Sequence, residues 1–133
     1  MKKFLSVIFT AVLIFSFSGC GISFAAKKTI PESEIFSADE INRAMNVVCH
    51  KFAFDFDGCV LLEIEYDEEY SKERANDWAE DYGYEQGIVL TSRFYVYSDG
   101  DGSLEPGATY EKWEWILARN SRGAWKLITW GYG

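Results

Sequence analysis

Few side chains of this 133-residue chain have the type and spacing that catalysis needs. His50 is the single histidine, and it falls opposite the apolar stripe of an expected helix, on the solvent side. A general base needs a cavity and an orienting acid, and common zinc sites need further histidine or cysteine ligands. The sequence also contains no CxxC, G-x-S-x-G or phosphate-binding glycine motif. We therefore expect no catalytic residue, no bound metal and no cofactor.

Two tryptophans and one arginine are better candidates for contact with a ligand. Trp113 and Trp115 share one face of an expected strand, and Arg93 is the one charge inside another apolar strand. Aromatic rings with a polar edge bind sugars and other flat ligands. A guanidinium in such a strand either binds an anion or pairs with a nearby acid. Arg93, Trp113 and Trp115 form the candidate ligand surface, although core packing is the preferred interpretation of the tryptophans, because aromatic residues dominate small cores.

Acidic residues offer two further motifs, both of which we interpret structurally. The acids from Glu63 to Glu69 fit the solvated faces of a strand and a helix. Asp99 and Asp101 match two ligand positions of a calcium-binding EF-hand loop, but the first ligand and the final bidentate glutamate are missing. Asp and Gly tolerate positive φ, so this segment predicts a turn.

The first twenty residues predict export. Lys2 and Lys3 precede an uncharged apolar run, Phe4 to Phe17, which ends in small residues. This pattern is typical of a secretory signal peptide, here residues 1–19. The run is too short to span a bilayer comfortably, since a helix needs about 20 apolar residues for that.

Two cleavage sites compete at the end of this segment. Phe17-Ser18-Gly19-Cys20 resembles the bacterial lipobox, although that motif usually has Leu at the position of Phe17. The resemblance implies that Cys20 is lipidated and becomes the mature N-terminus, and several acyl chains anchor a protein stably to a membrane. The alternative is ordinary cleavage after Ser23-Phe24-Ala25, which releases a soluble secreted protein.

The three cysteines form an odd set for an exported chain. If Cys20 carries lipid, Cys49 and Cys59 remain as a possible disulfide in an oxidising compartment. Two thiols that form no disulfide are the alternative, and the sequence leaves both open.

Length and charge restrict the class of protein. Without residues 1–19 the chain has 114 residues, which suits one small domain. Loss of Lys2 and Lys3 changes the formal charge from −8 to −10. An acidic surface argues against binding to nucleic acid and to anionic lipid headgroups.

Organised sequence is expected from residue 37 onward, after a tether of residues 20–36. Ser37 and Glu40 form a capping box, and an apolar stripe then follows at helical spacing. A strand, a second helix ending at Gly83 and three more strands follow. In the last strand, alternation predicts that Trp125 and Leu127 face one way and Trp130 the other. The expected apolar stripe of the first helix is Ile41, Ala44, Met45, Val48 and Phe52.

This order predicts an α+β fold in residues 37–133, with a long N-terminal helix on a curved antiparallel sheet and a short second helix between the first two strands. The order and the tryptophan-rich ending, Trp113 to Tyr132, resemble small secreted bacterial lipoproteins with a nuclear-transport-factor-2-like (cystatin-like) cone domain. The resemblance implies fold but no single activity, because such domains include enzymes, binding domains and inert partners. We expect a non-catalytic domain that binds a small molecule, a peptide or an envelope component. An interaction or inhibitor subunit is the alternative, and a small enzyme with a site inside the cone is a weaker one.

Overall fold

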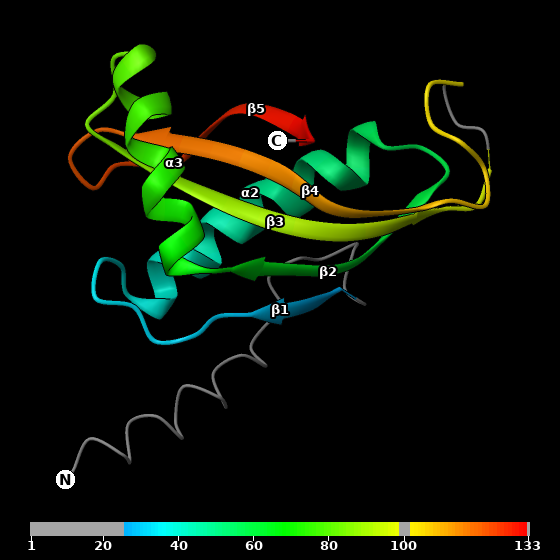
Figure 1. Cartoon of the computed structure of the whole chain (residues 1–133), viewed down its shortest axis with the longest axis horizontal. Coiled ribbons are helices and arrows are strands. Elements are labelled where there is room, and N and C mark those ends of the chain that lie inside the picture. The colour runs from blue at the N-terminus through cyan, green and yellow to red at the C-terminus, as the bar shows by residue number, and fades with distance from the viewer. Residues whose placement is uncertain (1–25, 99–101, 133) are drawn as a thin grey trace, which may run out of the picture.

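The computed structural model describes residues 26–98 and 102–132. Figure 1 shows two helices and five strands in the order β1, α2, β2, α3, β3, β4, β5. The helices are α2 (Ala38–Asp55) and α3 (Glu68–Asp81). The strands are β1 (Lys27–Thr29), β2 (Cys59–Tyr66), β3 (Gln86–Val96), β4 (Thr109–Arg119) and β5 (Lys126–Tyr132). The expected α+β class is confirmed.

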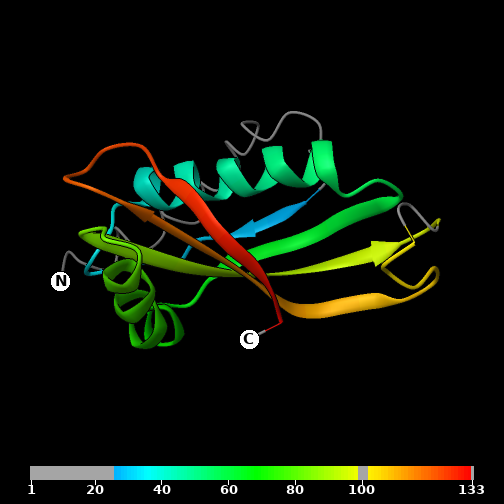
Figure 2. The ribbon, with the colours of Figure 1, turned by 90° about the horizontal axis from the view of Figure 1, so that it is seen from above.

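The five strands form one mixed sheet in the order β1-β2-β3-β4-β5. β1 pairs parallel with β2, and every later pair is antiparallel. The prediction of a purely antiparallel sheet led by a long helix is therefore wrong in two respects, since a parallel strand is present and precedes α2. Figure 2 shows the layers: α2 lies along one face of the sheet and α3 covers part of the other.

Helix α2 forms as its sequence predicts. Ser37 accepts a hydrogen bond from the Glu40 backbone amide, and the Glu40 carboxylate accepts one from the Ser37 amide, so the capping box is complete. Each residue of the expected stripe is at most 2% exposed and packs into the main core against the sheet. The apolar period of this helix therefore fixes which face of α2 covers the sheet.

Strand β1 shortens the expected tether. Lys27–Thr29 pairs with Glu63–Glu65 of β2, and Ile30 and Phe36 are both buried in the main core. Residues 27–36 thus belong to the domain. Sequence patterning missed this strand because three residues with two lysines carry no apolar alternation.

Lys28 is an unusual member of the strand because it is only 4% exposed. Its Nζ donates to Oδ1 of Asn42 and of Asn46, each at 2.8 Å, both on α2. Burial lowers the pKa of Lys28 from 10.5 to about 8. The lysine therefore links β1 to α2 through two amide side chains.

Helix α3 packs closely on the opposite face of the sheet. Ala75 of the helix meets Val89 and Ile116 in a second, smaller core, flanked by Trp78 and Ile128. The close approach depends on Gly87, because a Cβ there would lie 2.7 Å from the carbonyl oxygen of Ala75. Tyr82, directly after the helix, is 54% exposed and stacks on Trp78.

Neither outer strand of the sheet presents a long regular edge. β1 has only three residues, two of them lysines. In β5, Thr129 pairs with Ile116 and Leu127 with Leu117, so Ile128 is an extra residue in the strand, a β-bulge.

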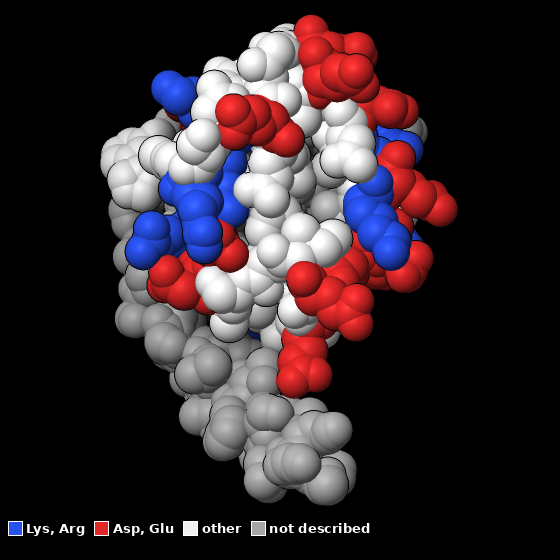
Figure 3. All heavy atoms as spheres, turned by 90° about the vertical axis from the view of Figure 1, so that its left-hand side faces the viewer, with Lys and Arg blue, Asp and Glu red and all other residues white. Residues whose placement is uncertain are grey.

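Figure 3 shows the end of the molecule at the left of Figure 1, where acidic side chains gather in several groups with fewer basic ones between them.

Candidate functional site

Arg93 lies where both neighbouring strands carry an extra residue. On β2, Leu61 pairs with Phe94 and Glu63 with Arg93, so Leu62 is inserted between them. On β4, Trp113 pairs with Ser92 and Tyr110 with Phe94, so Glu111 and Lys112 together oppose Arg93. Lys112 has a φ of 56°, in the left-handed region. Bulges redirect side chains, and here two of them flank one arginine.

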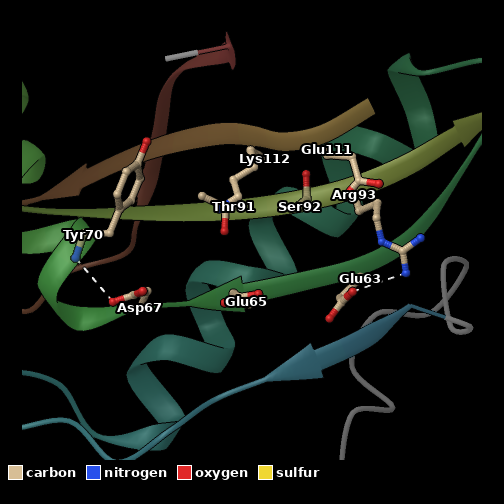
Figure 4. Close-up of a pocket in the computed structure, with 9 residues that line it drawn as sticks. All are labelled: Glu63, Glu65, Asp67, Tyr70, Thr91, Ser92, Arg93, Glu111 and Lys112. Carbon is tan, nitrogen blue, oxygen red and sulfur yellow. Dashed lines mark hydrogen bonds and ion pairs between the residues drawn. The ribbon is translucent and has the colours of Figure 1, made fainter. Parts of the chain in front are cut away.

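Around this arginine is a cavity of about 150 Å³, which we call the Arg93 pocket. It opens on the face of the sheet that α3 covers only in part. In Figure 4, Arg93 and Glu63 lie at one end, Tyr70 and Asp67 at the other, and Glu65 and Thr91 between them. The complete lining is Glu63, Glu65, Asp67, Tyr70, Thr91, Ser92, Arg93, Glu111 and Lys112.

The charges in the Arg93 pocket are only partly paired. Arg93 Nη2 lies 3.3 Å from Glu63 Oε1, and both side chains are partly exposed. The Asp67 carboxylate caps α3 by accepting from the Tyr70 amide at 3.4 Å. Among the described residues, Glu65, Glu111 and Lys112 have no side-chain ion pair.

A buried acid lies directly behind one wall of this pocket. Glu114 is 3% exposed, Arg74 Nη2 donates to its Oε1 at 3.0 Å, and the Tyr70 hydroxyl donates to its Oε2. Burial raises the pKa of the Glu114 carboxyl above its usual value. The contacts fix the position of the Tyr70 ring, so this wall is preorganised.

A second cavity, of about 340 Å³, lies at the C-terminal end of α2 on the other face of the sheet; we call it the tryptophan groove. Lys51 lies over the Trp130 ring, 4.6 Å from its centroid, and forms an ion pair with Asp55. The buried Trp113 Nε1 has no hydrogen-bond partner among the described residues. The lining is Lys51, Asp55, Phe56, Asp57, Ser103, Leu104, Trp113 and Trp130.

The structure does not bring the three expected ligand residues together. Trp115 is fully buried, and its Nε1 donates to the Ser92 hydroxyl at 2.8 Å, so it belongs to the core. Trp113 lines the tryptophan groove, whereas Arg93 lines the pocket on the opposite face. The predicted shared face of Trp113 and Trp115 is confirmed, since both pack against the core beneath α2.

Sequence patterning assigned Trp130 to the wrong face of its strand and did not identify several pocket acids. The bulge at Ile128 reverses the alternation in β5, so Trp130 pairs with Trp115 and lies on the same side as Leu127. Glu63, Glu65 and Asp67 line a pocket, although we interpreted them as solvated. No local signal distinguishes a pocket acid from a surface acid, because the pocket depends on strands distant in sequence.

The cysteines do not follow the expected pairing. Cys49 is in a disulfide, whereas Cys59 Sγ donates to the carbonyl oxygen of Asp57 at 3.7 Å. Cys49 and Cys59 are therefore not bonded to each other: the first is a buried residue of α2 and the second lies at the beginning of β2.

Several other expectations fall beyond what the structure describes. The signal peptide, Cys20 and the calcium-like acids Asp99 and Asp101 lie outside the described residues. Within residues 26–98 and 102–132, three or more His, Cys, Asp or Glu side chains nowhere gather as a metal site. His50 is exposed and contacts Phe54. In the same ranges, no helix has the length and apolarity to cross a membrane.

Comparison of the chain with protein-family models, curated proteins and solved structures finds no match. The geometry of the two cavities therefore carries the functional argument alone.

Proposed function

We propose that this protein is an exported, lipid-anchored domain that binds a small ligand in the tryptophan groove without catalysing its conversion. The observation that carries the proposal is the groove itself, about 340 Å³ between Trp113, Trp130 and the end of α2. Ligand sites have volumes of roughly 300–1,000 Å³, so the groove has the size for a small molecule.

The lining indicates the chemistry of such a ligand. Trp113, Trp130, Phe56 and Leu104 supply apolar surface, and Asp55, Asp57, Lys51 and Ser103 supply a polar edge. A sugar ring has the matching shape, with an apolar face that stacks on an indole and hydroxyl groups that donate to carboxylates. The buried Trp113 Nε1 also needs an acceptor, because an unpaired buried donor costs about 1–3 kcal/mol.

The contacts of the candidate catalytic groups support a binding role over an enzymatic one. The Tyr70 hydroxyl is engaged by Glu114, and Arg93 pairs with Glu63. A general acid or base must be able to reach a substrate proton, and these groups already serve internal contacts. His50 lines neither the Arg93 pocket nor the tryptophan groove.

We also propose that the domain is related to the nuclear-transport-factor-2-like cone folds. A long helix packed on one face of an antiparallel set, β2 to β5, supports this relation. The position of α3 on the opposite face departs from a simple cone. The alternative role, an interaction or inhibitor subunit, would use the exposed aromatic rings beside the groove, among them Phe54 and Tyr132.

Tryptophan fluorescence tests the groove directly. The full chain is titrated with N,N′-diacetylchitobiose, followed by other amino-sugar oligosaccharides of cell envelopes. We expect a saturable change in emission. Trp130→Ala should weaken the affinity about tenfold, or about 1.4 kcal/mol, because it removes the stacking surface.

Trp78→Phe is the matched control, since Trp78 is a residue of α3 and does not line the groove. It should lower total emission and leave the affinity unchanged. A lack of saturable binding to every glycan, or equal affinity in the Trp130→Ala variant, would count against the proposed site.

Anchoring through Cys20 has its own test. Cells fed a labelled fatty acid should incorporate it into the protein, and Cys20→Ser should abolish the label. One sulfur cannot hold both a lipid thioether and a disulfide. Recovery of Cys20 joined to Cys49 from cells would therefore contradict lipidation.

A further inference from the structure

We propose that the Arg93 pocket is a second binding site, independent of the tryptophan groove, and that it takes an alkylammonium group. The group could belong to a free diamine or to a lysine side chain of a peptide, since both present the same cation on a short alkyl chain. This site lies on the face of the sheet opposite the groove.

The walls of the pocket come from three strands and one helix. β2 supplies Glu63 and Glu65, β3 supplies Thr91 and Arg93, and β4 supplies Glu111 and Lys112. The beginning of α3 closes one end with Tyr70, as Figure 4 shows. The ring of Tyr70 is fixed from behind by Glu114, so the cavity is a built feature of the fold.

Charge determines the class of ligand. Four carboxylates and two cations line the cavity, and one carboxylate, Glu63, already pairs with Arg93. Lys27 on β1, in register with Glu63, adds a positive charge beside the lining. Glu65 and Glu111 have no ion pair among the described residues, so a bound ammonium would supply one. The formal charge of −8 for the whole chain adds to the attraction for cations.

The same arrangement disfavours an anion at Arg93. Glu63 occupies one side of the guanidinium, and Glu111 comes from the bulge that opposes it. An incoming carboxylate or phosphate would have to displace Glu63 and approach the remaining acids. Arg93 therefore neutralises the pocket in part, and its removal should strengthen cation binding.

The size of the pocket limits the ligand to a short chain. A volume of about 150 Å³ equals that of roughly five water molecules in the liquid. An aminobutyl group with its ammonium occupies a comparable space. Tyr70 and Thr91 supply an aromatic wall for the alkyl part and a hydroxyl for the ammonium.

Amide chemical shifts of the full chain, followed by NMR, test this inference. The probes are 1,4-diaminobutane, N-acetyl-lysine amide and inorganic phosphate. We expect saturable shifts at Glu65, Thr91 and Lys112 with one or both amines, and none there with phosphate. Glu65→Gln should weaken amine binding about fivefold, and Arg93→Gln should strengthen it by a similar factor.

Glu80→Gln, an exposed change on α3 outside the lining, is the matched control and should leave the affinity unchanged. Thermal unfolding of each variant verifies that it is folded. Binding of the lysine amide alone would identify a peptide as the source, and binding of the diamine would identify a free amine. The inference is overturned by unsaturable shifts, by phosphate binding at these residues, or by weaker amine binding in Arg93→Gln. None of these outcomes depends on the tryptophan groove.

Discussion

Lys28 shows how one residue can bind a segment to a domain. Its ammonium group is buried with two amide oxygens and, among residues 26–98 and 102–132, has no carboxylate partner, so the charged form is poorly compensated. The depressed pKa, about 8 against 10.5, is the direct consequence. In the unfolded chain the same lysine keeps its proton throughout that interval.

The stability of the protein should therefore depend on pH in this range. Above pH 8 native Lys28 releases its proton while the unfolded form holds it, so the unfolded state binds more protons and stability rises with pH. Between pH 7.5 and 9.5 we expect urea denaturation to show a gain of about 1–2 kcal/mol.

Lys28→Met should abolish that rise, and Lys27→Met, on the exposed neighbour, should preserve it. A flat profile in the unmodified protein would contradict the burial of the charged amine. An unchanged rise of the unfolding free energy with pH in Lys28→Met would contradict the assignment of that rise to Lys28.

The other residues of interest differ in how far local sequence could identify them. The shared face of Trp113 and Trp115 follows from strand alternation, which is local. The separation of Arg93 from the two tryptophans does not follow from local alternation. It depends on the extra residues in β2 and β4, which flank Arg93 in the sheet but are distant in sequence. Trp130 was misplaced for the same reason, since one bulge reverses the facing of all residues beyond it.

Among the elements, helix α2 is the most predictable. Its capping box and apolar stripe lie within the helix and its cap, and each has the contacts expected of it. The presence of α3 after the first long strand was also predicted, but the face of the sheet that it covers was not. That choice depends on the fit of Ala75 against β3, and Gly87 is the residue that allows it.

Gly87→Ala should separate α3 from the sheet. The new Cβ would lie 2.7 Å from a backbone oxygen, so the helix must shift. We expect a loss of about 1–3 kcal/mol in the free energy of unfolding, measured by urea denaturation. Faster amide hydrogen exchange in α3 than in α2 should accompany it.

Gly123→Ala is the comparison, because Gly123 lies in the exposed turn before β5, where an added methyl would lie 3.0 Å from the Asn120 carbonyl oxygen. The loss there should be smaller and should leave exchange in α3 unchanged. Equal losses at both glycines would argue against close packing of α3 at Gly87.

For the whole molecule, the main consequence of β1 is a short distance in sequence between the domain and the proposed anchor, Cys20. Only six residues separate Cys20 from Lys27, where the sequence alone predicts a tether as far as residue 36. Fully extended, six residues reach about 20 Å. A domain anchored at Cys20 would therefore lie close to the lipid surface.

Limited trypsin digestion of membranes distinguishes the short link from the longer tether. Lys27 and Lys28 are in a paired strand, and cleavage there needs local unfolding. We expect the domain to stay on the membrane, whereas a variant with Gly-Ser-Arg-Gly-Ser inserted after Gly21 should be released quickly. If the unmodified protein were released as fast as the insertion variant, by cleavage after Lys27 or Lys28, the prediction of a tether as far as residue 36 would be supported instead.

The two outer strands have a further consequence for a protein held at a surface. A regular, uncovered strand invites another copy to add to it, and crowding on a membrane raises the local concentration of copies. Here one border is three residues long with two lysines, and the other is interrupted at Ile128. If the protein is anchored through Cys20 as proposed, these two edges would oppose strand addition between copies crowded on the membrane.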